Sequence, residues 1–282
     1  MADTGTLYIV ATPLGNTDDL SPRAREVLAA ADLVLAEDTR RTGLLFQRLG
    51  IAGRGFLSLH EHNEEGRVAQ VVAHLAEGRD AALVSDAGTP LVSDPGFLLV
   101  RACREAGIRV APVPGPSAAM AALMACGLPP YPFTFLGFLP HKAADRRKTL
   151  ERHGGPDAPD VTLVFFERKN RVRETLEAAH AVMGVRPFCI ARELTKVHEE
   201  FIVGTLDRWR DVPEDLLGEV TVVVGPPDKD AVTDKARVAA LLREESAVGG
   251  KPREVARRVK DKVRGWSVSG VYELLEAIRR DG

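Results

Sequence analysis

A chain of 282 residues that is 45% hydrophobic is long enough to bury one large core or two of medium size. Its net charge of −2 identifies no partner by itself, and its widely separated cysteines, Cys103, Cys126 and Cys189, fit neither a zinc site nor a disulfide framework. The amino terminus lacks the basic start of a signal peptide, and seven prolines interrupt the uncharged stretch 110–140, which excludes a membrane span there. We therefore expect a cytoplasmic protein with no membrane partner.

Short apolar runs alternate with amphipathic segments in the first half of the chain. Helices are expected over residues 22–31, after Ser21 as N-cap, and 40–49, closed by Gly50. Such alternation predicts a mostly parallel sheet with helices on both faces. The expected strands are residues 7–11, 33–37, 56–59, 81–85 and 109–113.

A proline-rich segment, residues 111–116, cannot be helical and suits a crossing between domains. The second half repeats the pattern, and from about residue 233 the chain reads as three helices. The second set of strands is expected at residues 133–137, 161–166, 187–191, 199–203 and 219–224. This organisation predicts an N-terminal α/β domain (1–113), a second α/β domain (114–227) and a helical, basic C-terminal region (228–282).

Polar segments follow three of the expected strands, at residues 12–16, 37–40 and 85–96. Ligands bind beyond the carboxyl ends of the strands in open parallel sheets, so these segments are candidate site walls. Neither a G-x-G-x-x-G fingerprint nor a GK[ST] phosphate loop occurs. In SDAGTPLVSDPG, Gly88 and Gly96 allow backbone conformations that suit a wall where a small molecule lies close to the main chain.

Several of these features also have a purely structural interpretation. Asp38 fits the N-cap of the following helix, and the small-residue helix after Ser117 (AAMAALMA) fits tight packing. His60 and His62 lie among acidic residues without a third ligand, which favours a solvated helix start over a metal site. No metal is expected.

Six segments occur in an order and spacing that resembles the tetrapyrrole methylase family: VATPLGN, AEDTR, SDAGTPLVSDPG, VPGPSA, FTFLGFLP and ARELTK. Within that family they are similar to the branch of small-subunit (16S) ribosomal RNA cytidine 2′-O-methyltransferases, over about residues 7–226. One departure stands out. The family usually carries an acidic residue followed by Ser/Ala-Pro-His-Arg, and this chain reads Glu167-Arg168-Lys169-Asn170-Arg171, without the histidine.

The resemblance implies a homodimer that binds S-adenosylmethionine in the cleft between two α/β domains. It also implies methylation of the ribose 2′-hydroxyl of a cytidine in small-subunit ribosomal RNA, either naked or in an assembled subunit. The cofactor contacts that it implies are Pro13, Leu14, Gly15, Asp86, Ala87, Gly88, Leu91, Ser117, Ala118, Phe166 and Pro226.

A ribose hydroxyl is a poor nucleophile while protonated, so a general base beside it would help. The candidates are Asp38 from AEDTR, and Glu193 and Lys196 from ARELTK. The alternative for ARELTK is a surface cluster of ion pairs.

Basic residues concentrate in the C-terminal region. Residues 251–264 carry seven basic and two acidic residues, and Val255, Val259 and Val263 predict a helix with one apolar stripe and basic flanks. A solvated basic face on a packing helix is the alternative to RNA binding. The candidate RNA contacts are Arg40, Arg168, Lys169, Arg171, Arg192, Lys251, Arg253, Arg257 and Arg258.

Two other functions compete with ribosomal RNA methylation. A small-molecule tetrapyrrole methylase usually has G-x-G-x-G at the end of the first strand, where this chain has ATPLGN. A ribosome-assembly protein that binds RNA without catalysis would not need the intact AEDTR and SDAGTP segments.

Overall fold

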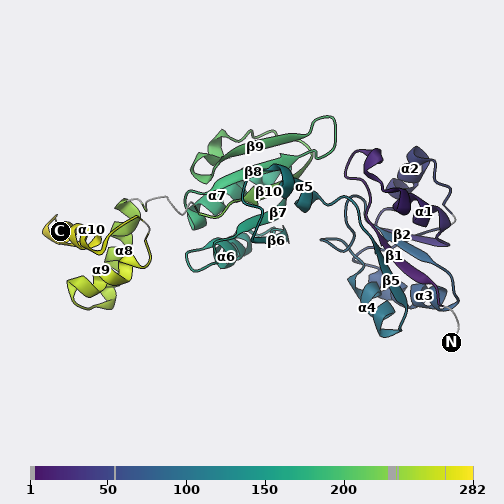
Figure 1. Cartoon of the computed structure of the whole chain (residues 1–282), viewed down its shortest axis with the longest axis horizontal. Coiled ribbons are helices and arrows are strands. Elements are labelled where there is room, and N and C mark those ends of the chain that lie inside the picture. Colours follow the sequence, from purple (N-terminus) through teal and green to yellow (C-terminus); the bar gives the residue numbers. More distant parts are fainter. Residues whose placement is uncertain (1–3, 54, 228–232, 234, 264, 282) are drawn as a thin grey trace. The chain divides into compact units, whose positions relative to one another are not determined.

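The computed structural model describes residues 4–281 except 54, 228–232, 234 and 264, and it divides into two compact units, Met1–Pro226 and Pro227–Gly282. Figure 1 shows the chain coloured along its sequence. Both α/β sheets belong to the first unit. The boundary predicted between them at residue 113 stays a prediction.

The first sheet has the strand order β3-β2-β4-β1-β5, and each neighbouring pair is parallel. The strands are β1 (Thr6–Val10), β2 (Leu33–Ala36), β3 (Phe56–Ser58), β4 (Ala81–Val84) and β5 (Arg109–Val113). They lie within one residue of the expected bounds, so the parallel sheet is confirmed. Pro112 is tolerated in β5 because β5 is an edge strand, where a missing N–H breaks no ladder.

Helices cover both faces of this sheet (Figure 1). One core includes Leu28 of α1 (Pro22–Ala30) and Phe46 of α2 (Thr39–Leu49); the other includes Leu75 of α3 (Glu64–Ala76) and Leu99 of α4 (Phe97–Glu105). Ser21 caps α1 by accepting the amide of Ala24 at 3.1 Å, as predicted. A short 3-10 helix, η1 (Thr17–Asp19), follows the first strand end.

The second sheet has the order β6-β7-β10-β8-β9 and is mixed. β6 pairs with β7 in parallel, whereas the other described pairings are antiparallel, so the expectation that the second half repeats the first is wrong in this respect. For β8 and β9 the physical reason is their short connection, residues 193–199, because a parallel crossover needs about a dozen residues or more. The strands are β6 (Phe133–Phe138), β7 (Thr162–Arg168), β8 (Pro187–Arg192), β9 (Glu200–Thr205) and β10 (Glu219–Val224).

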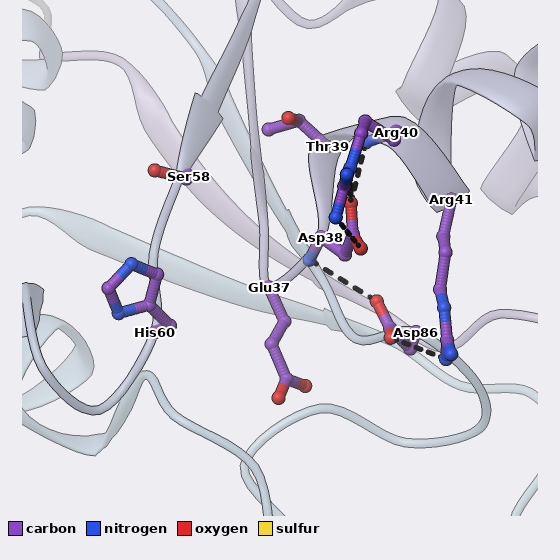
Figure 2. Close-up of a pocket in the computed structure, with 8 residues that line it drawn as sticks. All are labelled: Glu37, Asp38, Thr39, Arg40, Arg41, Ser58, His60 and Asp86. Carbon is purple, nitrogen blue, oxygen red and sulfur yellow. Dashed lines mark hydrogen bonds and ion pairs between the residues drawn. The ribbon is translucent and has the colours of Figure 1, made fainter.

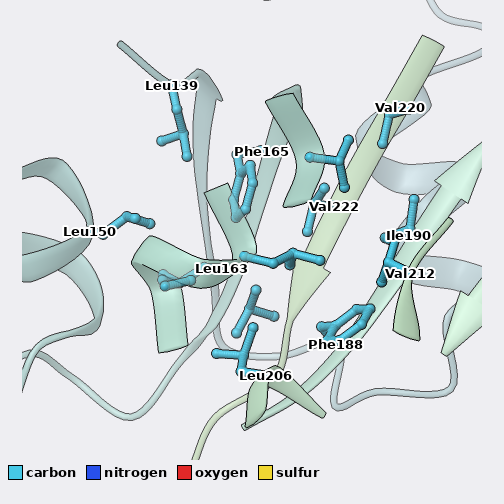
Figure 3. Packing of buried hydrophobic residues seen from close by; sticks show 14 of the residues in the cluster. Leu139, Leu150, Leu163, Phe165, Phe188, Ile190, Leu206, Val212, Val220 and Val222 are labelled. Carbon is cyan, nitrogen blue, oxygen red and sulfur yellow. The ribbon is translucent and has the colours of Figure 1, made fainter. Parts of the chain in front are cut away.

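A hydrophobic core fills one face of the second sheet (Figure 3). Phe165 and Phe188 are fully buried there, and each contributes about 1.5–3 kcal/mol through burial. The helical elements of this half are α5 (Ala118–Ala125), α6 (Ala143–Gly154), η2 (Lys169–Arg171), α7 (Val172–Met183) and η3 (Leu206–Asp211). Of these, α5 packs on the opposite face, beside β7 and β10.

The C-terminal unit contains α8 (Lys235–Val248), α9 (Pro252–Lys260) and α10 (Val268–Asp281). Val255, Val259 and Val263 are buried in its core, which confirms the predicted apolar stripe. The helix ends at Lys260, earlier than expected, and position 264 lies outside the described residues. Within the described parts of the chain, no helix has the length and apolar character needed to cross a membrane.

Candidate functional site

A cavity of about 700 Å³ lies where the carboxyl ends of the first sheet meet the second sheet. This volume is within the range of about 300–1,000 Å³ that is typical of small-molecule sites. Its first-half lining is Leu14, Arg41, Asp86, Ala87, Gly88, Thr89, Val92, Ser93 and Asp94. Its second-half lining is Ser117, Ala118, Phe138, Phe166, Glu167, Arg168, Lys169, Asn170, Leu194, Gly218, Glu219, Val220 and Thr221.

Seven of the eleven predicted cofactor residues line this cavity: Leu14, Asp86, Ala87, Gly88, Ser117, Ala118 and Phe166. The other four predicted residues do not line the cavity. Pro13 and Gly15 flank Leu14, and Pro13 is buried whereas Gly15 is exposed. Leu91 packs into the core of the first sheet, and Pro226 follows the end of β10. The cavity thus gathers most of the predicted set, and contact of each residue with a cofactor stays a prediction.

The loop 85–96 is held in a fixed shape beside the cavity. Thr12 and Gly88 exchange backbone hydrogen bonds of 2.8 and 3.0 Å, and the hydroxyl of Ser85 donates to the carbonyl of Ala87 at 3.2 Å. Leu91 and Ser93 adopt left-handed φ angles of 68° and 74°, which side chains other than glycine rarely take. Backbone strain of this kind is concentrated at functional sites.

Glu64 anchors the far end of the same loop. Its carboxylate accepts the amides of Gly96, Leu98 and Leu99 at 3.1, 2.8 and 3.3 Å, and so caps the start of α4. With 8% of its surface exposed, Glu64 is buried. The expectation that the helix start around His60 and His62 is solvated is therefore wrong for Glu64.

No group of three or more His, Cys, Asp or Glu suited to a metal ion occurs among the residues that the structure describes.

A smaller polar pocket lies beside the cavity and includes Asp38 and Arg40 (Figure 2). Asp38 Oδ1 accepts the amide of Arg40 at 2.9 Å, which confirms its capping role for α2, and Oδ2 pairs with the Arg40 guanidinium at 3.2 Å. The hydrogen bond from Arg40 lowers the pKa of Asp38. A carboxylate with a lowered pKa is a weaker base, and the role of Asp38 as a general base stays a prediction.

Asp86 joins this pocket to the cavity, because it lines both. Its Oδ1 accepts the amide of Asp38 at 3.3 Å, and its Oδ2 accepts from Arg41 Nη1 at 2.9 Å (Figure 2). These contacts tie the loop 85–96 to the start of α2.

Asp94, at the second Ser-Asp turn, has an unusual ionisation. Burial is the largest cause that raises its pKa to about 6, and the nearby Glu37 carboxylate adds to the effect. The pKa of Glu37 is also raised, first by burial and then by Asp86. Negative charge thus accumulates at the strand ends of the first sheet.

We expect Asp94→Asn to raise the thermal midpoint at pH 8 by about 2–4 °C and to have a smaller effect at pH 4.5. Because the folded pKa lies above the unfolded value of about 3.9, the protonated carboxyl contributes stability that is lost as pH rises towards 6. The variant removes that loss, and partial exposure to solvent limits the gain to about 1 kcal/mol. Thermal unfolding followed by circular dichroism at the two pH values measures it. Equal shifts at both would show that the pKa is not raised.

The segment with Glu193 and Lys196 docks onto the first half of the chain at Gly15. The amide of Asn16 donates to Thr195 Oγ1 at 3.0 Å, and a Cβ added at Gly15 would collide with Lys196 Cγ. Glu193 and Thr195 both have left-handed φ angles, of 51° and 64°. The tight turn thus brings Lys196 to the edge of the cavity, which Leu194 lines.

Lys196 is held between two carboxylates, with its ammonium 3.0 Å from Glu193 Oε1 and 3.5 Å from Glu219 Oε2. Burial lowers the pKa of Lys196, but the hydrogen bonds and charges of Glu193 and Glu219 outweigh it, so the net pKa is raised. The hydrogen bond from Lys196 lowers the pKa of Glu193. A protonated amine cannot accept a proton, so this geometry suits Lys196 as a fixed positive charge rather than a base.

The candidate RNA-contacting residues of the first unit fall into two groups: those exposed at the cavity and those held by acidic side chains. Arg168 and Lys169 are exposed and line the cavity, whereas Arg40 pairs with Asp38 and Arg192 Nε donates to Glu200 at 2.6 Å. The prediction that Arg171 contacts RNA is wrong, because Arg171 is only 8% exposed and its Nε donates to Glu167 Oε1 at 2.9 Å. It stabilises the start of α7 and is not free to contact a phosphate.

In the C-terminal unit, Arg253 and Arg257 are exposed on α9, and Lys251 is exposed at its N-cap. Arg258 instead ties α9 to α8, since its guanidinium donates to Glu245 Oε2 at 2.6 Å and to the carbonyl of Gly249 at 2.8 Å. The basic face therefore combines exposed cations with one that packs the bundle.

Sequence reasoning missed several lining residues, among them Arg41, Asp94, Phe138 and Glu219. Asp94 and Phe138 lie inside two of the family-like segments, SDAGTPLVSDPG and FTFLGFLP. The second Ser-Asp turn and the aromatic residues of the latter segment were the available signals.

Residues 6–209 match the family model described as Tetrapyrrole (Corrin/Porphyrin) Methylases. The chain belongs to the tetrapyrrole methylase family. "Ribosomal RNA small subunit methyltransferase I" of Escherichia coli O157:H7 is 44% identical over 277 residues, covering 95% of this chain and 94% of that protein. The protein of the same name from Xylella fastidiosa (strain Temecula1) is 48% identical over 252 residues, covering 86% and 91%. These relatives confirm the predicted branch of the family.

Solved structures share the fold. The uroporphyrin-III C-methyltransferase from Thermus thermophilus, complexed with S-adenyl homocysteine, matches with a TM-score of 0.55 and 17% identity, over 78% of this chain and 97% of that one. A diphthine synthase matches with a TM-score of 0.59 and 16% identity, over 78% and 90%. At these identities the likeness shows the fold of the tetrapyrrole methylases and no more.

Proposed function

We propose that this protein is an S-adenosylmethionine-dependent methyltransferase that methylates the ribose 2′-hydroxyl of a cytidine in small-subunit ribosomal RNA. The observation that carries the proposal is the match, along 95% of the chain, to a protein named a small-subunit ribosomal RNA methyltransferase. The cavity of about 700 Å³, shared by both sheets and bordered by Arg168 and Lys169, is consistent with a cofactor and an RNA substrate meeting there.

The residues of the cavity fit the cofactor chemically. The loop at Asp86–Gly88 offers backbone groups, and Leu14 and Phe166 offer an apolar wall for a flat ring such as adenine. Ser117 and Ala118 lie at the start of α5, where unpaired N–H groups and the helix dipole favour a carboxylate. A neighbour of the same fold is complexed with S-adenyl homocysteine, the product form of this cofactor, which supports the choice of cofactor.

S-adenosylmethionine, when bound, supplies a methyl group on a positively charged sulfur. In the transfer a bond would form between the ribose oxygen and the methyl carbon while the carbon–sulfur bond breaks to leave a neutral thioether, and the hydroxyl proton would pass to solvent water. Holding the hydroxyl in line with the departing sulfur lowers the barrier by up to about 7–11 kcal/mol. We assign this positioning to the cavity walls, and we assign to Lys196 the stabilisation of negative charge on the attacking oxygen.

We also propose that the protein is a cytoplasmic homodimer. Phe97, Met120 and Met124 are large apolar side chains with exposures of 64%, 47% and 85%. Exposed apolar surface of this kind is a common feature of protein–protein contacts, and a second copy of the chain would cover it. Sedimentation velocity of the purified protein tests the dimer.

Transfer of labelled methyl groups to three acceptors tests the proposed function. The acceptors are small ribosomal subunits from a strain lacking the enzyme, the naked RNA of those subunits, and a uroporphyrin-type tetrapyrrole. We expect saturable heat on calorimetric titration with S-adenosylmethionine, and label in the RNA of one or both ribosomal acceptors. Label in the tetrapyrrole would favour the small-molecule methylase. Absence of both heat and label would favour a non-catalytic RNA binder.

The basic face of α9 leads to a separate prediction. We expect the triple variant Lys251→Ala, Arg253→Ala and Arg257→Ala to weaken RNA binding and to flatten its salt dependence. Each phosphate contact contributes about 0.7–0.9 to the slope of log K against log salt, so three lost contacts reduce the slope by about 2–3. Titration of fluorescent small-subunit RNA at several salt concentrations measures this.

A matched control is the triple variant Arg101→Ala, Arg147→Ala and Arg208→Ala, which removes the same charge from arginines that each pair with a nearby acid. Its slope is expected to equal that of the wild type. An unchanged slope in the α9 variant would show that this helix only packs the bundle.

A further inference from the structure

Phe138 is a large apolar side chain left open to solvent at the wall of the cavity. It is 56% exposed, whereas the next residue, Leu139, is buried in the core. Phenylalanine is usually buried, and an exposed ring beside a polar cavity offers a flat apolar surface to a ligand.

A backbone irregularity sets the direction of this ring. The pairing of β6 with β7 shifts register between Phe135 and Phe138, as a β-bulge does. Gly137 within it has a left-handed φ of 63°, and a Cβ there would lie 3.0 Å from Ser93 Oγ of the loop 85–96. Bulges next to active sites re-aim side chains, and this one places Phe138 at the cavity.

The ring is supported from below by other aromatic rings. Its centroid lies 5.4 Å from that of Phe166, which in turn contacts Phe135 edge-on at 5.0 Å. Phe138 forms the exposed end of this row. Contact with Phe166 holds one side of the Phe138 ring in place, and the other side is open to a ligand. A ligand that stacks on the open side therefore costs little loss of side-chain freedom.

Cations border the same stretch of wall. Arg168 and Lys169 are exposed and line the cavity with Phe138, and no ion pair of either occurs among the described residues. Lys169 and Asn170 stand where the family usually carries Pro-His. An exposed aromatic ring beside unpaired cations is the combination that proteins use to hold an unstacked base and its phosphate.

We propose that Phe138 binds the base of the target nucleotide by stacking, with Arg168 and Lys169 at the adjoining phosphates. The inference rests on the proposed function, since it requires an RNA substrate in this cavity. The base is drawn out of its stack onto the ring, and its ribose is presented to the cofactor walls formed by the loop at Asp86–Gly88 and by Ser117.

Phe138→Ala and Phe138→Trp test the proposal, with Phe133→Ala as the control. Phe133 is a partly exposed phenylalanine on the same strand that does not line the cavity. Stacking contributes about 1–3 kcal/mol per base, so we expect Phe138→Ala to lower kcat/KM for small subunits by about 5- to 150-fold. The Kd for S-adenosylmethionine should stay within about twofold of the wild-type value, and Phe138→Trp and Phe133→Ala should retain most activity.

Three outcomes would overturn the inference. Unchanged kcat/KM in Phe138→Ala would show that no base stacks there, and a weakened cofactor Kd that accounts for the whole loss would assign the ring to adenine. Failure of Phe138→Trp to retain activity would show that the ring's shape, and not stacking, is what matters. In each case wild-type transfer to RNA persists. A wild type that transfers no methyl group to RNA would instead contradict the proposed function itself.

Discussion

Asp86→Arg is expected to abolish cofactor binding, raising the Kd for S-adenosylmethionine at least about 100-fold, or about 2.7 kcal/mol. The wild-type carboxylate accepts from Arg41 at 2.9 Å and from the amide of Asp38 at 3.3 Å, and it lines the cavity. An arginine would bring a like charge against Arg41 and a longer side chain into the cavity. Calorimetric titration measures the loss.

The matched control for this prediction is Glu26→Arg. It makes the same change of charge in the same half of the chain, at an exposed position of α1 remote from the cavity lining. We expect its Kd to equal that of the wild type. A wild-type Kd in Asp86→Arg would remove the loop 85–96 from the cofactor site.

Lys196→Ala is expected to lower kcat by about 10²–10³ while leaving the cofactor Kd within about twofold of the wild-type value. The ammonium, held by Glu193 and Glu219 with a raised pKa, carries a fixed positive charge at the cavity edge. A group that acts mainly in the transition state affects turnover more than ground-state binding. Single-turnover transfer of labelled methyl groups separates the two effects.

Because the stem of Lys196 packs over Gly15, loss of packing has to be separated from loss of charge. Lys196→Met keeps most of the stem and removes the charge, so it is expected to be impaired as strongly as the alanine variant. Lys196→Arg keeps a charge and should retain part of the activity. If Lys196→Met turns over at the wild-type rate, the charge has no catalytic role and the residue only joins the two halves.

The strands of the first sheet could be predicted closely because their positions follow from local patterns, whereas their order in the sheet was not predicted. Each strand is a short apolar run, and the first two helices have their own signals, Ser21 at the start of α1 and Gly50 at the end of α2. The second sheet was harder. Its strands were found, but their directions depend on connection length, and residues 193–199 carried the signal that β8 and β9 are antiparallel.

The candidate site could be predicted where a loop follows a strand, and less well where side chains meet across long separations. Glu64 became a buried cap because its partners are the amides of Gly96, Leu98 and Leu99, which no local pattern around His60 reveals. Arg171 has a structural role because it forms an ion pair with Glu167, four residues before it in the chain. Phe138 reached the cavity through a bulge, and bulges leave only a faint sequence signal, here Gly137.

The measurement that tests the central claim most directly is nucleoside analysis of small-subunit RNA after incubation with the protein and labelled S-adenosylmethionine. The subunits come from a strain lacking the enzyme, and the RNA is digested to nucleosides and analysed by mass spectrometry. The proposed function predicts label in 2′-O-methylcytidine at one nucleotide, where the RNA also resists alkaline cleavage. Label on a base, or no label from a protein that binds the cofactor, would contradict it.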